Sequence, residues 1–288
     1  MIKNLCFLVL SILAILVLFQ FFYVDKVSAN DSYSGHIAIG KEYLMRGSYN
    51  RAVREFTGAI KSKPRNSLAY IERGTAYNQM GNYKSAITDF TKAIELDSKN
   101  YLAFNNRGVA NFRQGELKNA LADFNQAINL NKKSPFARLN YAGAALASKT
   151  GSKGAKELDS WLTENNWKGK YSGHAAVLSI LGYKQSKDSA KANAMLVKAL
   201  KKVNRLEWPY PVLNYLNGKL KQEELIESAK ESDYDATQAH CFIALNELNS
   251  NNSKLAQENL NWIAKYGTKN SVEYWLCKNL LKKNSPGK

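Results

Sequence analysis

The chain has 288 residues, of which 45% are hydrophobic and 23% charged, and its formal net charge is +17. This apolar share is enough for a folded core, so the composition excludes a largely disordered chain. Five prolines are few for this length, which argues against a β-sandwich or a collagen-like chain and favours helices. Three cysteines exclude a small disulfide-dense scaffold. The positive charge favours anionic partners: nucleic acid, phospholipid headgroups or acidic protein surfaces.

The first thirty residues predict export. Lys3 precedes an apolar run over residues 5–24, and Val27 and Ala29 are small residues of the kind that precede a signal-peptide cleavage site. The run is longer than a usual signal-peptide core and would span a bilayer as a helix. Two outcomes follow: cleavage after Ala29 gives a soluble periplasmic protein, and an uncleaved segment 5–24 anchors the chain in the inner membrane. In both cases the remaining chain is exported, so we expect no nucleic-acid partner.

A period of 34 residues runs through the first half of the chain, in the registers 33–66, 67–100 and 101–134. Five positions are identical in all three copies: the eighth (Gly40, Gly74, Gly108), the fifteenth (Gly47, Gly81, Gly115), the twentieth (Ala52, Ala86, Ala120), the twenty-fourth (Phe56, Phe90, Phe124) and the twenty-seventh (Ala59, Ala93, Ala127). Glycine and alanine let two helices cross closely, and the phenylalanine fills the space between them. Glycine at the fifteenth position ends the first helix in a left-handed conformation. Each repeat therefore predicts a helix pair that stacks on its neighbours.

These residues resemble the tetratricopeptide repeat (TPR) family. The resemblance implies an all-α fold, an α-α superhelix or TPR solenoid, that acts as a binding scaffold for a protein or peptide. A half repeat follows over residues 135–148, with Pro135 at the start of its helix. The polar Gly/Ser/Lys run after it predicts a linker over residues 149–170.

The remaining residues, 171–288, predict a degenerate TPR-like helical domain. Ser189 is the expected N-cap of one of its helices. Helices are expected at 175–182, 189–203, 212–216, 222–229, as a pair within 237–270, and at 272–283. The strings at 208–218 and 267–274 are similar to bacterial periplasmic repeat proteins of the new-lipoprotein-I type, whose members dock hydrolases and proteases acting on the cell wall. The lipid-bearing cysteine of that family has no counterpart here.

The TPR resemblance also implies a partner-binding surface, because the second, fifth, ninth, twelfth and thirteenth positions of each repeat line the concave face of the superhelix. These are Ser34, Ile37, Lys41, Leu44 and Met45, then Leu68, Ile71, Thr75, Asn78 and Gln79, then Leu102, Asn105, Val109, Phe112 and Arg113. The surface is apolar and rich in amides, so it suits a peptide or helix with apolar anchors and one or two acids. The alternative is that neighbouring turns, or the C-terminal half folding back, cover these residues.

A basic stripe in the C-terminal half gives a second candidate surface. Lys191, Lys198, Lys202 and Arg205 fall on one helix face, where they would contact anionic membrane lipid, cell-wall polymer or an acidic partner. The alternative is a solvated outer face, which is what most charge runs are.

The two cysteines outside the N-terminal segment, Cys241 and Cys277, stand about one repeat apart, so adjacent helices would bring them together. Either a disulfide or two buried free thiols fits this spacing. The sequence contains no Gly-x-Ser-x-Gly, Walker or metal-spaced histidine motif. We therefore expect a binding protein in the bacterial envelope, with no catalysis, no cofactor and no metal.

Overall fold

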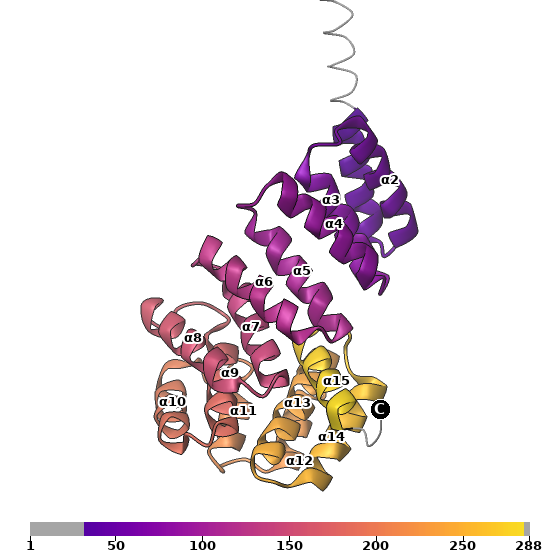
Figure 1. Ribbon diagram of the computed structural model, residues 1–288. Coiled ribbons are helices and arrows are strands. Elements are labelled where there is room, and N and C mark those ends of the chain that lie inside the picture. The colour runs from indigo at the N-terminus through magenta and orange to yellow at the C-terminus, as the bar shows by residue number, and fades with distance from the viewer. Residues whose placement is uncertain (1–31, 285–288) are drawn as a thin grey trace, which may run out of the picture. The chain divides into compact units, whose positions relative to one another are not determined.

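The computed structural model describes residues 32–284, and this part of the chain contains helices and turns without strands (Figure 1). The predicted signal peptide or anchor at residues 1–29 lies outside the described residues. Within residues 32–284, no helix is both long enough and apolar enough to cross a bilayer. The predicted all-α fold class is confirmed.

Within the described residues the chain divides into two compact units, which meet between Asn106 and Arg107. The boundary falls inside helix α5 (Tyr101–Gln114), whereas the sequence placed it at 149–170. Unit 1 contains a helix at residues 32–45 and the start of α5. Between them lie α2 (Tyr49–Ser62), α3 (Ser67–Gln79) and α4 (Tyr83–Leu96). In the described part of unit 1 these helices form the expected pairs, first helix against second.

The repeat glycines have the two roles that their spacing predicts. A Cβ atom on Gly74 would lie 2.8 Å from the ring of Phe90, so only glycine lets the two helices meet there. Gly40 with Phe56, and Gly108 with Phe124 in unit 2, repeat this contact at 2.5 and 2.7 Å. The glycines after the first helices, Gly47, Gly81 and Gly115, have φ angles of 69°, 79° and 100°. These left-handed residues end the helices without steric strain.

Unit 2 continues the same architecture. After the rest of α5 its helices are α6 (Leu117–Leu130), α7 (Pro135–Ala147), α8 (Gly151–Glu164), α9 (Ser172–Gln185), α10 (Ser189–Lys202), α11 (Tyr210–Leu216), α12 (Gln222–Ala229), α13 (Asp233–Asn249), α14 (Ser253–Tyr266) and α15 (Val272–Asn284). The last helix packs against α7, α13 and α14 (Figure 1). Pro135 begins α7, as predicted.

The predicted linker at 149–170 was wrong, because residues 151–164 form helix α8. This helix is the second member of a fourth pair, and its Gly154 approaches α7 so closely that a Cβ would lie 2.7 Å from the Cα of Ala142. Lys149 takes the place of the terminal glycine, with a φ of 63°. The glycines of α8 therefore serve helix packing, whereas the Gly/Ser/Lys composition of the segment suggested a flexible linker.

In the later helix pairs a left-handed residue still ends the first helix, but this residue is not glycine. Lys187 ends α9 with a φ of 59°, and Asn251 ends α13 with a φ of 61°. The expected N-cap Ser189 is also wrong by one residue: Asp188 caps α10, and its Oδ1 accepts a hydrogen bond from the Lys191 backbone N–H at 3.1 Å. A carboxylate fills this role as well as a hydroxyl does.

Candidate functional site: the first-helix face of the repeats

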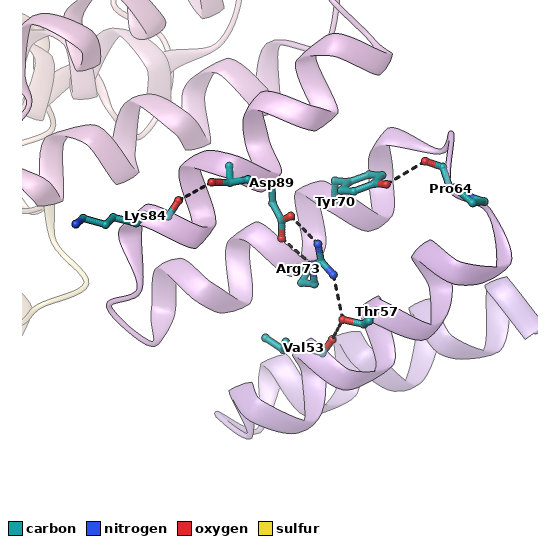
Figure 2. A network of polar contacts seen from close by, with 8 residues as sticks. Val53, Thr57, Pro64, Tyr70, Arg73, Lys84 and Asp89 are labelled. Carbon is teal, nitrogen blue, oxygen red and sulfur yellow. Dashed lines mark hydrogen bonds and ion pairs between the residues drawn. The ribbon is translucent and has the colours of Figure 1, made fainter.

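A buried ion pair holds the helices of unit 1 in place (Figure 2). Arg73 of α3 donates from Nε and Nη2 to the two carboxylate oxygens of Asp89 on α4, both at 2.8 Å. Its Nη1 donates to Thr57 Oγ1 on α2 at 3.1 Å. The hydrogen bond to Asp89 raises the pKa of Arg73 further above its usual value. Arg73 therefore joins three consecutive helices and serves the scaffold.

Comparable pairs occur in other repeats, always with the twenty-third position as one partner. In Arg73–Asp89 and Arg107–Asp123 the second partner is the residue at the seventh repeat position. In His36–Glu55, Arg138–Glu157 and His240–Asn259 it is the residue at the fourth repeat position. Sequence reasoning missed this pairing, although an acid or amide at every twenty-third position signals it. His36 and His240 thus each form a hydrogen bond between two helices. The His240 ring also stacks on the Trp262 ring, with centroids 3.8 Å apart.

The first predicted surface residues lie on the helix at 32–45. Met45 is 82% exposed. Ile37 and Leu44 are half-buried and pack against the core beside Ala52 and Phe56. Lys41 is exposed and forms an ion pair with Glu72, with Nζ 3.0 Å from Oε1. This part of the predicted surface is accessible.

The second repeat is less open than its sequence implies. Ile71 is 6% and Asn78 9% exposed, so both belong to the packed interior of unit 1 and the prediction of accessible side chains was wrong for them. The hydroxyl of Thr75 is occupied, because it donates to the Ile71 carbonyl at 2.8 Å. Gln79 is exposed. Asn105, in the third repeat, donates to Asn106 Oδ1 at 3.3 Å.

Five large apolar residues are exposed in the described part of unit 1, and two of them, Ile39 and Met80, lie outside the predicted inner-face positions. Met45, Leu68 and Leu102 are 82%, 39% and 46% exposed, and all three occupy positions predicted to line the inner face. We call these three residues the apolar anchors of unit 1. Large apolar side chains that stay exposed at positions expected to line one face are typical of a docking surface.

In unit 2 the predicted surface is partly covered by the end of the chain. Val109 is half-buried. Phe112 is 2% exposed, and its carbonyl accepts a hydrogen bond from Asn279 of α15 at 3.0 Å. Arg113 lies over the Trp275 ring, 5.5 Å from its centroid. The alternative that the C-terminal half covers the surface therefore holds for Phe112 and Arg113, which are not open partner-binding residues.

The basic stripe is exposed on α10 and just after it. Lys198, Lys202 and Arg205 are exposed, whereas Lys191 pairs with Asp188 at 2.7 Å. Two apolar residues accompany them, Val197 at 53% and Leu206 at 96% exposed. The stripe thus has an apolar component that its charges alone did not predict.

Cys241 of α13 and Cys277 of α15 are buried free thiols whose sulfurs lie 2.8 Å apart. The two helices thus bring the side chains together, and both cysteines are free in this structure. Burial raises the pKa of the Cys241 thiol well above its ordinary value, which keeps it protonated and unreactive. No group of three or more metal-ligating side chains occurs among the described residues.

Comparison with known proteins identifies the repeats. A family model described as "TPR repeat" matches residues 74–115, and one described as "Tetratricopeptide repeat" matches residues 101–134. The chain contains tetratricopeptide repeats. No curated protein matches the chain in sequence, so its resemblance to lipoproteins of the new-lipoprotein-I type stays a prediction.

Solved structures show how far the TPR fold extends. A tetratricopeptide repeat protein from Parabacteroides merdae aligns with a TM-score of 0.57 at 15% identity, covering 87% of this chain and 99% of that one. MamA aligns at 0.53 and 21% identity, covering 60% and 92%. YrrB, described as a TPR protein with an unusual peptide-binding site, aligns at 0.51 and 20% identity, covering 64% and 91%. At these identities the likeness establishes the fold alone.

Proposed function

We propose that this protein is an exported TPR scaffold that binds a protein or peptide partner in the bacterial envelope and catalyses no reaction. One observation carries the proposal: the apolar anchors Met45, Leu68 and Leu102 are exposed in unit 1, at repeat positions that are expected to line the concave face. Leaving such side chains in water has no structural benefit, whereas a partner that buries them gains the hydrophobic free energy.

The chemistry of the surface indicates what the partner presents. Apolar side chains at helical or extended spacing would cover the anchors. Lys41 is 47% exposed despite its ion pair with Glu72, so an acidic group of the partner can share it. The YrrB structure, with its described peptide-binding site, shows that the same fold can host a peptide in another protein.

Export is supported by the N-terminal sequence alone. A mass measurement of the mature protein tests it, since cleavage after Ala29 leaves a chain that begins at Asn30. Recovery with the membrane pellet at full mass would instead support the anchor formed by residues 5–24.

The binding site is tested by partner capture from envelope extracts, using the full-length chain and two charge-introducing variants. The double variant Met45→Glu/Leu68→Glu places charges at two anchors, and we expect it to lose the captured partner. Leu206→Glu is the matched control, because Leu206 is 96% exposed in unit 2, and we expect it to keep the partner. Equal capture by both variants would refute the proposed surface.

A second candidate function is contact with an anionic surface through α10. The exposure of Leu206 and Val197 beside Lys198, Lys202 and Arg205 favours it, because apolar insertion and charge attraction act together at lipid headgroups. The variant Lys198→Glu/Lys202→Glu separates the two functions. Lost binding to anionic liposomes with retained partner capture would establish the surface contact as a separate activity.

A further inference from the structure

Unit 2 contains a cavity of about 650 Å³ between α7, α9, α13 and the start of α15. Aromatic side chains form much of its wall: Phe136, Tyr171, Trp208 and Tyr234. The rings of Phe136 and Tyr171 meet edge to face with centroids 5.1 Å apart. A cavity of this size with aromatic walls can enclose a small ligand or one long side chain.

A hydrogen-bond chain at the cavity wall fixes the orientation of its polar groups. Trp208 Nε1 donates to Gln238 Oε1 at 2.5 Å. Because an indole nitrogen can only donate, this contact identifies the Gln238 oxygen. The same oxygen lies 2.9 Å from His174 Nε2, which must therefore carry the proton. Gln238 Nε2 then donates to Glu273 Oε1 at 2.8 Å.

Two acceptor atoms remain unused at the cavity. With its proton on Nε2, neutral His174 presents a lone pair at Nδ1. That atom and Glu273 Oε2 are both buried and accept no hydrogen bond of good geometry from the described residues, although the Ser271 side chain and the Glu273 backbone N–H lie near enough to stabilise the carboxylate. Glu273 is only 2% exposed. A buried carboxylate oxygen without a donor is costly, so the site is one in which a bound donor would be strongly favoured.

The charged residues around the cavity indicate the sign of the charge that a ligand would carry. Glu207 and Asp235 line it together with Glu273, against Lys170, whose Nζ lies over the Tyr171 ring at 5.2 Å. Burial raises the pKa of Glu273. A group of three carboxyls stands out in a chain of net charge +17. Both the unused acceptors and the local charge therefore favour a cation.

We propose that this cavity binds a primary ammonium or guanidinium group, with N–H donors directed at Glu273 Oε2 and His174 Nδ1 and the aromatic rings around the alkyl chain and the charge. Aromatic walls with a carboxylate are a combination that attracts organic cations. The ligand is either a free alkylamine or a lysine or arginine side chain of another polypeptide. The site lies wholly in unit 2 and does not depend on the apolar anchors of unit 1.

Calorimetric titration of the full-length protein tests the ligand class. The probes are cadaverine, N-acetyl-lysine methylamide and N-acetyl-arginine methylamide, with N-acetyl-norleucine methylamide as the neutral control. We expect the cations to bind at least about tenfold more tightly than the norleucine derivative, since charge-assisted hydrogen bonds distinguish them. Tighter binding of cadaverine identifies a free amine as the ligand source, and tighter binding of a capped residue identifies a side chain. No measurable binding of any cation, or equal binding of the norleucine derivative, overturns the proposal.

Variants locate the bound cation. Glu273→Gln keeps an acceptor for Gln238 and removes the charge, so we expect it to weaken cation binding by at least about tenfold. Glu258→Gln is the control, because Glu258 is exposed on α14 and its loss changes the net charge equally. Tyr234→Leu removes a half-exposed ring of the wall and keeps the Glu273 carboxyl, and we expect this second variant to weaken cation binding. Wild-type affinity in folded Glu273→Gln, or in Tyr234→Leu, overturns the site.

Discussion

Arg73 and Asp89 are joined by two parallel hydrogen bonds of 2.8 Å, and Asp89 is only 4% exposed. This bidentate pair connects α3 to α4, while the third guanidinium nitrogen holds Thr57 of α2. Its counterpart Arg107–Asp123 lies one repeat later, with N–O distances of 3.0 and 2.7 Å. These Arg–Asp pairs hold neighbouring helices together, which explains why the charged residues recur at the repeat period without forming a reactive site.

Removing one partner of this pair should be far worse than removing both. Arg73→Met leaves the Asp89 carboxylate buried without its donor, so we expect a loss of about 3 kcal/mol in the free energy of unfolding. The double variant Arg73→Met/Asp89→Leu should recover much of that loss. Urea denaturation followed by circular dichroism measures both, and a double variant no more stable than the single one would contradict the assignment.

The crossing glycines predict a sharp difference between two Gly→Ala substitutions. Gly74→Ala places a methyl 2.8 Å from the Phe90 ring, and such overpacking costs about 1–3 kcal/mol. Gly35→Ala, also in a first helix, has no atom within 4 Å of the new methyl. It should stabilise the protein by about 0.5–1 kcal/mol through helix propensity. Similar melting temperatures for the two variants would contradict the helix register.

Lys149 predicts a substitution that stabilises the protein. Its φ of 63° costs an L-residue about 1 kcal/mol, which glycine does not lose. Lys149→Gly should therefore raise the free energy of unfolding by about that amount, whereas Lys149→Val should lower it, because a β-branched residue tolerates this conformation least. Thermal unfolding compares the three chains, and a destabilised glycine variant would show that α7 does not end there in a left-handed residue.

Glu273 predicts how stability depends on pH. Its pKa is raised by burial, so the folded state holds this proton more tightly than the unfolded chain. The stabilisation from the bound proton is complete below the ordinary glutamate pKa and is lost as pH rises through the raised value. Glu273→Gln removes this loss. The stability of Glu273→Gln relative to the wild type should therefore increase as pH rises above the ordinary glutamate pKa.

Unfolding at several pH values measures this difference directly. A constant difference between wild type and Glu273→Gln across the range would show that Glu273 does not titrate with a raised pKa. Gln238 would still receive an oxygen acceptor from the variant side chain, so the comparison isolates the proton and leaves the hydrogen-bond chain in place.

The sequence predicted the helix pairs where glycine, alanine and phenylalanine keep their 34-residue spacing. It failed at 149–170, because Lys149 replaces the terminal glycine and the helix that follows begins with a Gly/Ser/Lys run. It also predicted the accessible anchor Met45, but it gave the burial of Phe112 only as an alternative and could not say which residues would be covered. That burial involves Asn279 of α15, 167 residues further along the chain, and no local pattern encodes such a contact. The cavity in unit 2 was missed for the same reason, since its wall comes from five separate segments of the chain.

The central claim is that a partner docks on the first-helix face of unit 1, and hydrogen–deuterium exchange on the complex with a captured partner tests it most directly. We expect slower exchange in the helix at residues 32–45 and in α3, around the side chains of Met45 and Leu68. Unchanged exchange in both helices, with protection confined to α10 and its basic stripe, would contradict the account.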